Sequence, residues 1–360
     1  MTKLIEPSVA TAVAKRVAGR SENVAEADLA RLRHNLERSV PRSEELVASV
    51  SGIAAPPPVR WGILDRAAWA EANIAGMSSL IAPLTDKVGH RLDSLPLPIR
   101  LAQRGVVSVE IGAMLGYISK RVLGQYDLLV PEEPDRTTSR RLRRATGDAS
   151  LYFVGANMIE TEKKLHFVPE DFALWVAVHE VTHRFQFAGV PWLRDHFFGL
   201  VHSYMDSLEM DAKHFAQRLA TAGKRLLAKD TAPEERNAVY LFADGRQREV
   251  LDQLQALMAV VEGHGNFVMD TVGAQVIPSF PKMREMFQRK REQTKLVQRA
   301  VNYVIGLEMK MRQYELGQRF CESATARGGS GALAHLWADP RNLPTLAELR
   351  SPDLWLTRVA

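Results

Sequence analysis

Five consecutive residues have the types and spacing of a catalytic metal site. In His179-Glu180-Val181-Thr182-His183 the two imidazoles are four residues apart, a spacing that places them on one face of a helix. His179 and His183 can therefore bind one metal ion, and this H-E-x-x-H pattern is typical of Zn²⁺. Glu180 can accept a proton from a water molecule that the ion activates. The pattern thus predicts zinc-dependent hydrolysis at a carbonyl carbon.

A catalytic zinc ion usually has three protein ligands and one open position, so a third ligand is expected. The segment Glu262-Gly263-His264-Gly265 offers two candidates. Glu262 and His264 are separated by about 200° around a helix, so both can face one ion only if the helix is distorted. The two glycines would allow such a distortion. We favour Glu262 and keep His264 as the alternative third ligand.

Two further residues, and His264 again, are candidates for supporting roles. Asn266 lies one helical turn after Glu262, on the same face, and could orient a ligand histidine. Tyr314 and His264 are candidates to stabilise the oxyanion that forms when a carbonyl is attacked. The alternative for Tyr314 is a structural place at the polar edge of an amphipathic helix.

The elements that must position these residues are mostly helical. Apolar residues at helical spacing predict helices at about 27–40, 61–88, 99–123, 169–189, 192–227, 232–261, 283–297 and 301–326. Two short apolar runs, 151–154 and 165–168, predict strands. Gly112 and Gly116, four residues apart, predict close packing of their helix on a neighbour. The expected fold class is mainly α with a small antiparallel β-sheet.

The length of 360 residues suggests two domains or one domain with two lobes. The strand-like runs begin after about residue 125, and the histidine pair follows them. We therefore expect an N-terminal helical lobe at 1–125 and a catalytic lobe at 126–360.

Composition excludes several classes of function. The single cysteine, Cys321, excludes an intrachain disulfide framework and a multi-cysteine metal site. The net charge of +5, from 47 Lys and Arg against 42 Asp and Glu, is a small bias that does not indicate a nucleic-acid partner. No apolar stretch is long enough to cross a membrane, and the N-terminus lacks the apolar run of a secretion signal. We expect a cytoplasmic protein with no membrane partner.

At these residues the chain resembles the zincin superfamily of metallopeptidases, and its glutamate-zincin branch in particular. The pair Glu262-Gly263 is similar to the Glu-Gly that supplies the third zinc ligand in zinc aminopeptidases, although the spacer 184–261 is much longer here. More of the chain resembles a bacterial, mostly actinobacterial, family of zincin-like hydrolases, often labelled zinc-dependent metalloproteases or associated with deazaflavin coenzyme biosynthesis. The segments that carry this resemblance are Leu123-Gly-Gln-Tyr-Asp, Asp171-Phe-Ala-Leu-Trp, 179–187, Pro191-Trp-Leu-Arg, Glu262-Gly-His and 306–320.

The resemblance implies a zincin-like core, bound Zn²⁺ and a glutamate as third ligand. Together with the motif, it predicts a zinc-dependent hydrolase, and a metallopeptidase before other classes, with a peptide or another amide as substrate. A zinc hydrolase of a non-peptide amide or ester is the alternative within enzymes. The alternative outside enzymes is a zincin scaffold that acts as a binding protein without turnover.

Overall fold

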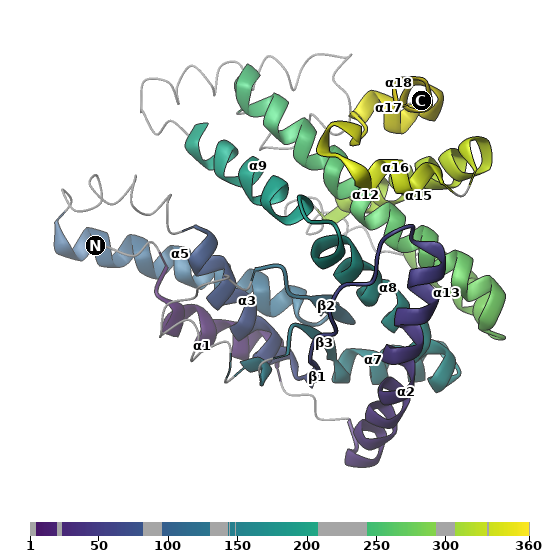
Figure 1. Ribbon diagram of the computed structural model, residues 1–360. Coiled ribbons are helices and arrows are strands. Elements are labelled where there is room, and N and C mark those ends of the chain that lie inside the picture. Colours follow the sequence, from purple (N-terminus) through teal and green to yellow (C-terminus); the bar gives the residue numbers. More distant parts are fainter. Residues whose placement is uncertain are drawn as a thin grey trace. The chain divides into compact units, whose positions relative to one another are not determined.

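The fold is described from a computed structural model (Figure 1) over residues 5–19, 24–81, 96–129, 143, 145–147, 149–207, 243–292, 307–329 and 331–359. The chain divides into two compact units. The first comprises Met1–Leu46, Pro56–Arg184 and Ile277–Met283, and the second comprises Val47–Ala55, Phe185–Val276 and Arg284–Ala360. The predicted boundary near residue 125 stays a prediction, and strands from before and after that residue pair within the first unit.

The first unit contains a three-stranded sheet in the order β1-β3-β2. The strands are β1 (Trp61–Leu64), β2 (Gly124–Tyr126) and β3 (Leu151–Val154). β3 is parallel to β1 and antiparallel to β2, so the sheet is mixed and not purely antiparallel as predicted. All four residues of β3 are buried, as expected for a central strand that is covered on both faces.

Six helices lie wholly or mostly in the described part of the first unit. They are α1 (Pro7–Ala18), α2 (Glu26–Val50), α3 (Arg66–Leu80), α5 (Leu97–Ile118), α7 (Gly155–Leu165) and α8 (Pro169–Gly189). The prediction that Gly112 and Gly116 permit close packing is confirmed. A Cβ atom at Gly112 would lie 2.4 Å from the carbonyl oxygen of Ala10, and one at Gly116 would lie 2.6 Å from that of Ala14. The backbones of α5 and α1 therefore meet directly.

Two local predictions in this unit are wrong. The run 165–168 is not a strand, because α7 continues to Leu165 and His166 ends it in the left-handed conformation with φ of 53°. The predicted helix 61–88 starts as β1, and α3 begins only after Asp65, whose side chain accepts a hydrogen bond from the Ala68 N–H at 2.7 Å. Residues 82–88 lie outside the described part of the chain.

The described residues of the second unit form helices and their connections, with no strand among them. Its helices are α9 (Leu193–Ser207), α12 (Gly245–Val276), most of α13 (Phe280–Glu292), α15 (Leu307–Gly328), α16 (Ala332–Ala338), α17 (Leu346–Arg350) and α18 (Pro352–Val359), with a 3-10 turn, η2, at Pro340–Asn342. α12 passes through Gly263 and Gly265 as one continuous helix, so the distortion that these glycines would have allowed does not occur. Gly263 instead provides space, because a Cβ atom there would lie 2.1 Å from the backbone carbonyl carbon of Gly317 on α15.

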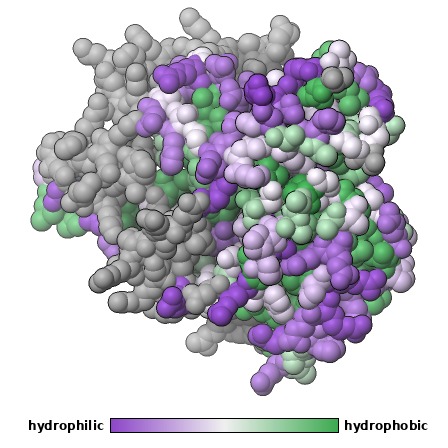
Figure 2. Space-filling model, viewed as in Figure 1, coloured by the Kyte–Doolittle hydropathy of each residue, from purple (hydrophilic) through white to green (hydrophobic). Residues whose placement is uncertain are grey.

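The described part of the visible surface shows no separation of hydrophilic from hydrophobic residues. Hydrophilic and hydrophobic residues are interspersed over the described part of the visible face (Figure 2). Among the described helices, none is long and apolar enough to cross a membrane.

Candidate metal centre

Helix α8 carries the histidine pair and is held firmly at its start. Pro169 opens it, and Glu170 and Asp171 lie in its first turn, where negative charge favours the helix dipole. The Asp171 carboxylate also accepts hydrogen bonds from the N–H and the hydroxyl of Ser279, at 3.0 and 2.6 Å. Residues 172–178 are all buried. The helix therefore reaches His179 in a fixed position.

The two histidines present their ring nitrogens to the same point. Their Nε2 atoms are 3.2 Å apart and their rings are inclined by 81°. Two nitrogens bound to one tetrahedral zinc ion at the usual Zn–N distance would be about 3.3 Å apart. His179 and His183 thus already have the separation that a shared zinc ion requires, and the half-buried site fits the metal.

Glu180 lies between the two histidines in sequence and faces the sheet. It is 7% exposed, and its side chain lies directly against Gly124 on β2. The buried Tyr152 donates a hydrogen bond to Asp127 Oδ2 at 2.8 Å. Burial, followed by the charges of Asp127 and Glu180, raises the pKa of Tyr152 well above its ordinary value. A carboxylate in this position can act as a base toward a water molecule beside the histidines.

Arg184 was not singled out from the sequence, although it directly follows His183. Its side chain is completely buried, donates a hydrogen bond to the Pro57 carbonyl at 2.7 Å and lies 2.9 Å from Glu44 Oε1. Burial lowers the pKa of the guanidinium, and the Glu44 carboxylate opposes this effect. The sequence signal for this role was an arginine in a mostly apolar helix, but the residues that Arg184 contacts are distant in sequence. The contacts fix α8 immediately after the second histidine.

The remaining candidates with described side chains lie on α12, in the second unit. The Val261 carbonyl accepts a hydrogen bond from Gln186 Nε2 at 2.8 Å. His264 is fully buried, with Nδ1 2.9 Å from Gln186 Nε2 and Nε2 3.2 Å from the carbonyl oxygen of Ser51. Both ring nitrogens of His264 therefore have partners inside this unit.

Glu262 and Asn266 are one turn apart on α12, the first half-buried and the second buried. Among the described residues, one group of three side chains could hold a metal ion: His179, His183 and Glu262. Tyr314 lies on α15, but its side chain is outside the described residues, so its predicted role stays a prediction.

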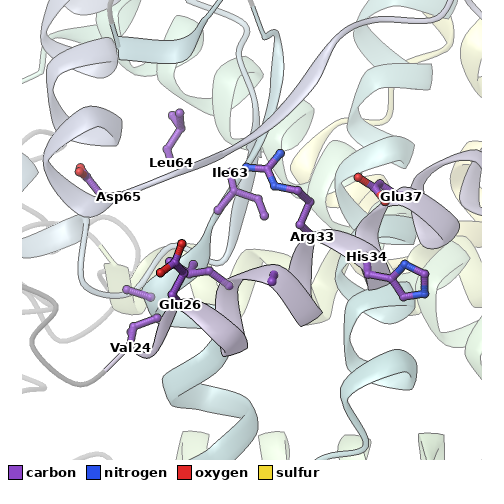
Figure 3. A pocket seen from close by; sticks show the side chains of 11 residues that line it. Val24, Glu26, Arg33, His34, Glu37, Ile63, Leu64 and Asp65 are labelled. Carbon is purple, nitrogen blue, oxygen red and sulfur yellow. The ribbon is translucent and has the colours of Figure 1, made fainter.

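A separate cavity of about 530 Å³ lies in the first unit. Its walls come from the exposed side of α2 and the end of β1, and Figure 3 shows the Arg33 and Glu26 side chains beside Ile63. None of the residues that line it belongs to α8 or α12. This cavity is therefore distinct from the histidine pair.

Comparisons with known proteins show which family the chain resembles. The model of a family described as zincin-like metallopeptidases matches residues 5–356. A solved crystal structure from Chloroflexus aurantiacus, described as "a putative hydrolase with a novel fold", is 30% identical in sequence with a TM-score of 0.69, and the match covers 98% of each chain. A search of curated proteins found no match.

Proposed function

The chain belongs to the zincin-like metallopeptidase family, and from this premise we propose that it is a zinc-dependent peptidase. The observation that carries the proposal is the convergence of the His179 and His183 Nε2 atoms, 3.2 Å apart, on a helix that also carries Glu180. A zinc ion bound there would polarise a carbonyl group and make a water molecule more acidic. Family membership and the similar hydrolase support the broader assignment as a zinc hydrolase.

Glu262 is the proposed third ligand. It belongs to the candidate ligand group, whereas the ring nitrogens of His264 are both engaged elsewhere. Gln186, in the last turn of α8, bonds to the α12 carbonyl that directly precedes Glu262. This contact supports the assignment because it ties the end of the histidine helix to the turn that carries the carboxylate. Asn266, one turn further along α12, is the proposed partner that orients a ligand.

Glu180 is the proposed general base. Its carboxylate would take a proton from the attacking water and then pass that proton to the leaving nitrogen, which balances the hydrolysis of an amide. Burial of the carboxylate beside Gly124 holds it in place for this transfer. A protein that only binds a partner would not need such a base, so the intact Glu180 favours an enzyme.

An extended peptide is the favoured substrate because of β2. This strand pairs with β3 on one side only and is therefore an edge strand in the described sheet. Edge strands can bind an extended peptide through backbone hydrogen bonds. Gly124 of this strand touches Glu180, so a peptide paired with β2 would pass close to the base. A non-peptide amide or ester would make no use of this edge.

The proposal is tested by Glu180→Gln, measured with a mixed peptide library and zinc analysis. Glutamine keeps the size of the side chain but cannot accept the proton, so we expect activity to fall by a factor on the order of 10² or more with zinc content unchanged. The matched control is Glu170→Gln, an exposed glutamate in the first turn of the same helix, which should retain full activity. Equal activity of wild type and Glu180→Gln would contradict the proposal. Hydrolysis of esters or small amides but of no peptide would reassign the substrate.

A further inference from the structure

Gly124 occupies a position where no other residue fits without displacing Glu180. A Cβ atom built on Gly124 would lie 2.6 Å from Cγ, 2.9 Å from Cδ and 3.0 Å from Oε1 of Glu180. Carbon atoms in contact are ordinarily separated by about 3.5 to 4.0 Å. Even an alanine would therefore overlap the Glu180 side chain along most of its length.

The need for glycine here is a need for space and not for an unusual backbone. The described glycines with positive φ are Gly19, Gly52, Gly147 and Gly329, and Gly124 is not among them. Its backbone belongs to a regular strand paired with β3, with Phe153 as its partner in the register. An alanine at this position would thus suit the local backbone and would be disfavoured only by its contact with Glu180.

The strand cannot easily move away from such a contact. The Val154 N–H donates a hydrogen bond to the carbonyl oxygen of Leu123 at 2.8 Å. The next residue of β2, Gln125, exchanges amide hydrogen bonds with Asn73 of α3, at 3.2 and 3.4 Å. Because β2 is fixed by β3 and α3, a side chain at residue 124 would shift the carboxylate of Glu180 before it shifted the strand.

We infer that Gly124 is a positioning residue for Glu180: its missing side chain forms the space that holds the carboxylate in its reactive place. The inference rests on the proposed role of Glu180 as general base. A displacement of about 1 Å at a reacting group can reduce a rate by a factor on the order of 10². The contact demands a shift of this size, so the identity of residue 124 would set the rate of hydrolysis and not the affinity for substrate.

The kinetic experiment compares Gly124→Ala with Gly62→Ala in the zinc-loaded, full-length protein. Gly62 is the matched control because it is also a strand glycine of this sheet, yet its built Cβ atom comes no closer than 3.4 Å, to the Ala149 Cβ. Gly124→Ala should lower kcat on a cleaved peptide on the order of 10²-fold, with KM and zinc content unchanged. Gly62→Ala should keep kcat within about twofold. A kcat for Gly124→Ala equal to that of Gly62→Ala would overturn the inference.

A second experiment needs no substrate and measures Tm in a double-mutant cycle. Gly124→Ala should lower Tm by about 3 °C or more in the wild-type background. In the Glu180→Ala background the overlapping atoms are gone, so the same substitution should leave Tm unchanged or raise it by restricting the unfolded chain. An equal Tm loss in both backgrounds would overturn the inference.

The two experiments separate this inference from the proposed function. If the Tm cycle shows coupling but the wild-type protein cleaves no peptide, Gly124 still positions Glu180 and only the peptidase assignment fails. If the wild type is active and Glu180→Gln is not, while the cycle shows no coupling, the function stands and the role of Gly124 is contradicted.

Discussion

The neighbours of each polar side chain determine whether it can bind a metal ion or is held by hydrogen bonds in the protein interior. His179, Glu180 and His183 could be proposed as site residues from spacing alone, because four-residue spacing on a helix already brings two imidazoles together. The choice between Glu262 and His264 could not be made in this way. It depends on Gln186 and Ser51, which hold the ring of His264 and which no local pattern connects to it. Gly124 and Arg184 were missed for the same reason.

The different surroundings of Glu262 and His264 predict that substitution of the first weakens zinc binding, whereas substitution of the second lowers stability. Glu262→Ala should weaken zinc binding by more than about 100-fold, the upper range for loss of a group that merely supports a zinc ligand. His264→Ala should retain zinc but destabilise the protein by about 3 kcal/mol, because it leaves a cavity and buried partners without hydrogen bonds. Chelator competition measures the first effect and denaturant unfolding the second. The reverse ranking in chelator competition would transfer the ligand role to His264.

The helices were more predictable than the strands. α8 matches the predicted range 169–189, since its apolar run, its opening proline and its closing glycine are all local signals. β1 and β3 pair across many intervening residues, and a run of four residues carries little information about its partner. The run 165–168 has similar composition but begins with the last residue of α7 and gains no strand partner in the described sheet. Whether such a short segment forms a strand depends on the presence of a pairing partner more than on the β-propensity of its residues.

The contact between α12 and α15 gives a prediction about helix packing. A Cβ atom at Gly263 would lie 2.1 Å from the Gly317 carbonyl carbon, and one at Gly317 would lie 1.7 Å from the Ala259 oxygen. Gly263→Ala should therefore destabilise the protein by about 3 kcal/mol, although alanine is the better helix former. Gly199→Ala on α9 is the control, because its Cβ atom would meet nothing within 4 Å, and it should stabilise by up to about 1 kcal/mol.

Denaturant unfolding of both variants tests this packing. A Gly263→Ala protein as stable as Gly199→Ala would mean that α12 and α15 do not approach so closely.

The division of the chain into two units could not be predicted from its sequence. A cut at residue 125 followed the change from helical to strand-like patterns, but β1 lies before that residue and pairs with β3 after it. Two short segments also belong to a different unit from the chain on either side of them. Val47–Ala55 belongs to the second unit although its flanking residues belong to the first, and Ile277–Met283 belongs to the first although its flanking residues belong to the second. Composition and periodicity describe consecutive residues, whereas this division depends on contacts between distant ones. The fold class itself, mainly α with a small sheet, was predictable because most of the chain carries a helical pattern.

The central claim is that His179 and His183 hold a zinc ion, and zinc analysis of the purified full-length protein tests it most directly. Elemental analysis should find about one zinc per chain in the wild type and in His202→Ala, a control at an exposed histidine on α9. It should find almost none in His183→Ala, which removes one of the two converging nitrogens. A wild-type protein that contains no zinc and takes up none on reconstitution would contradict the account, as would a His183→Ala variant that retains as much zinc as the wild type.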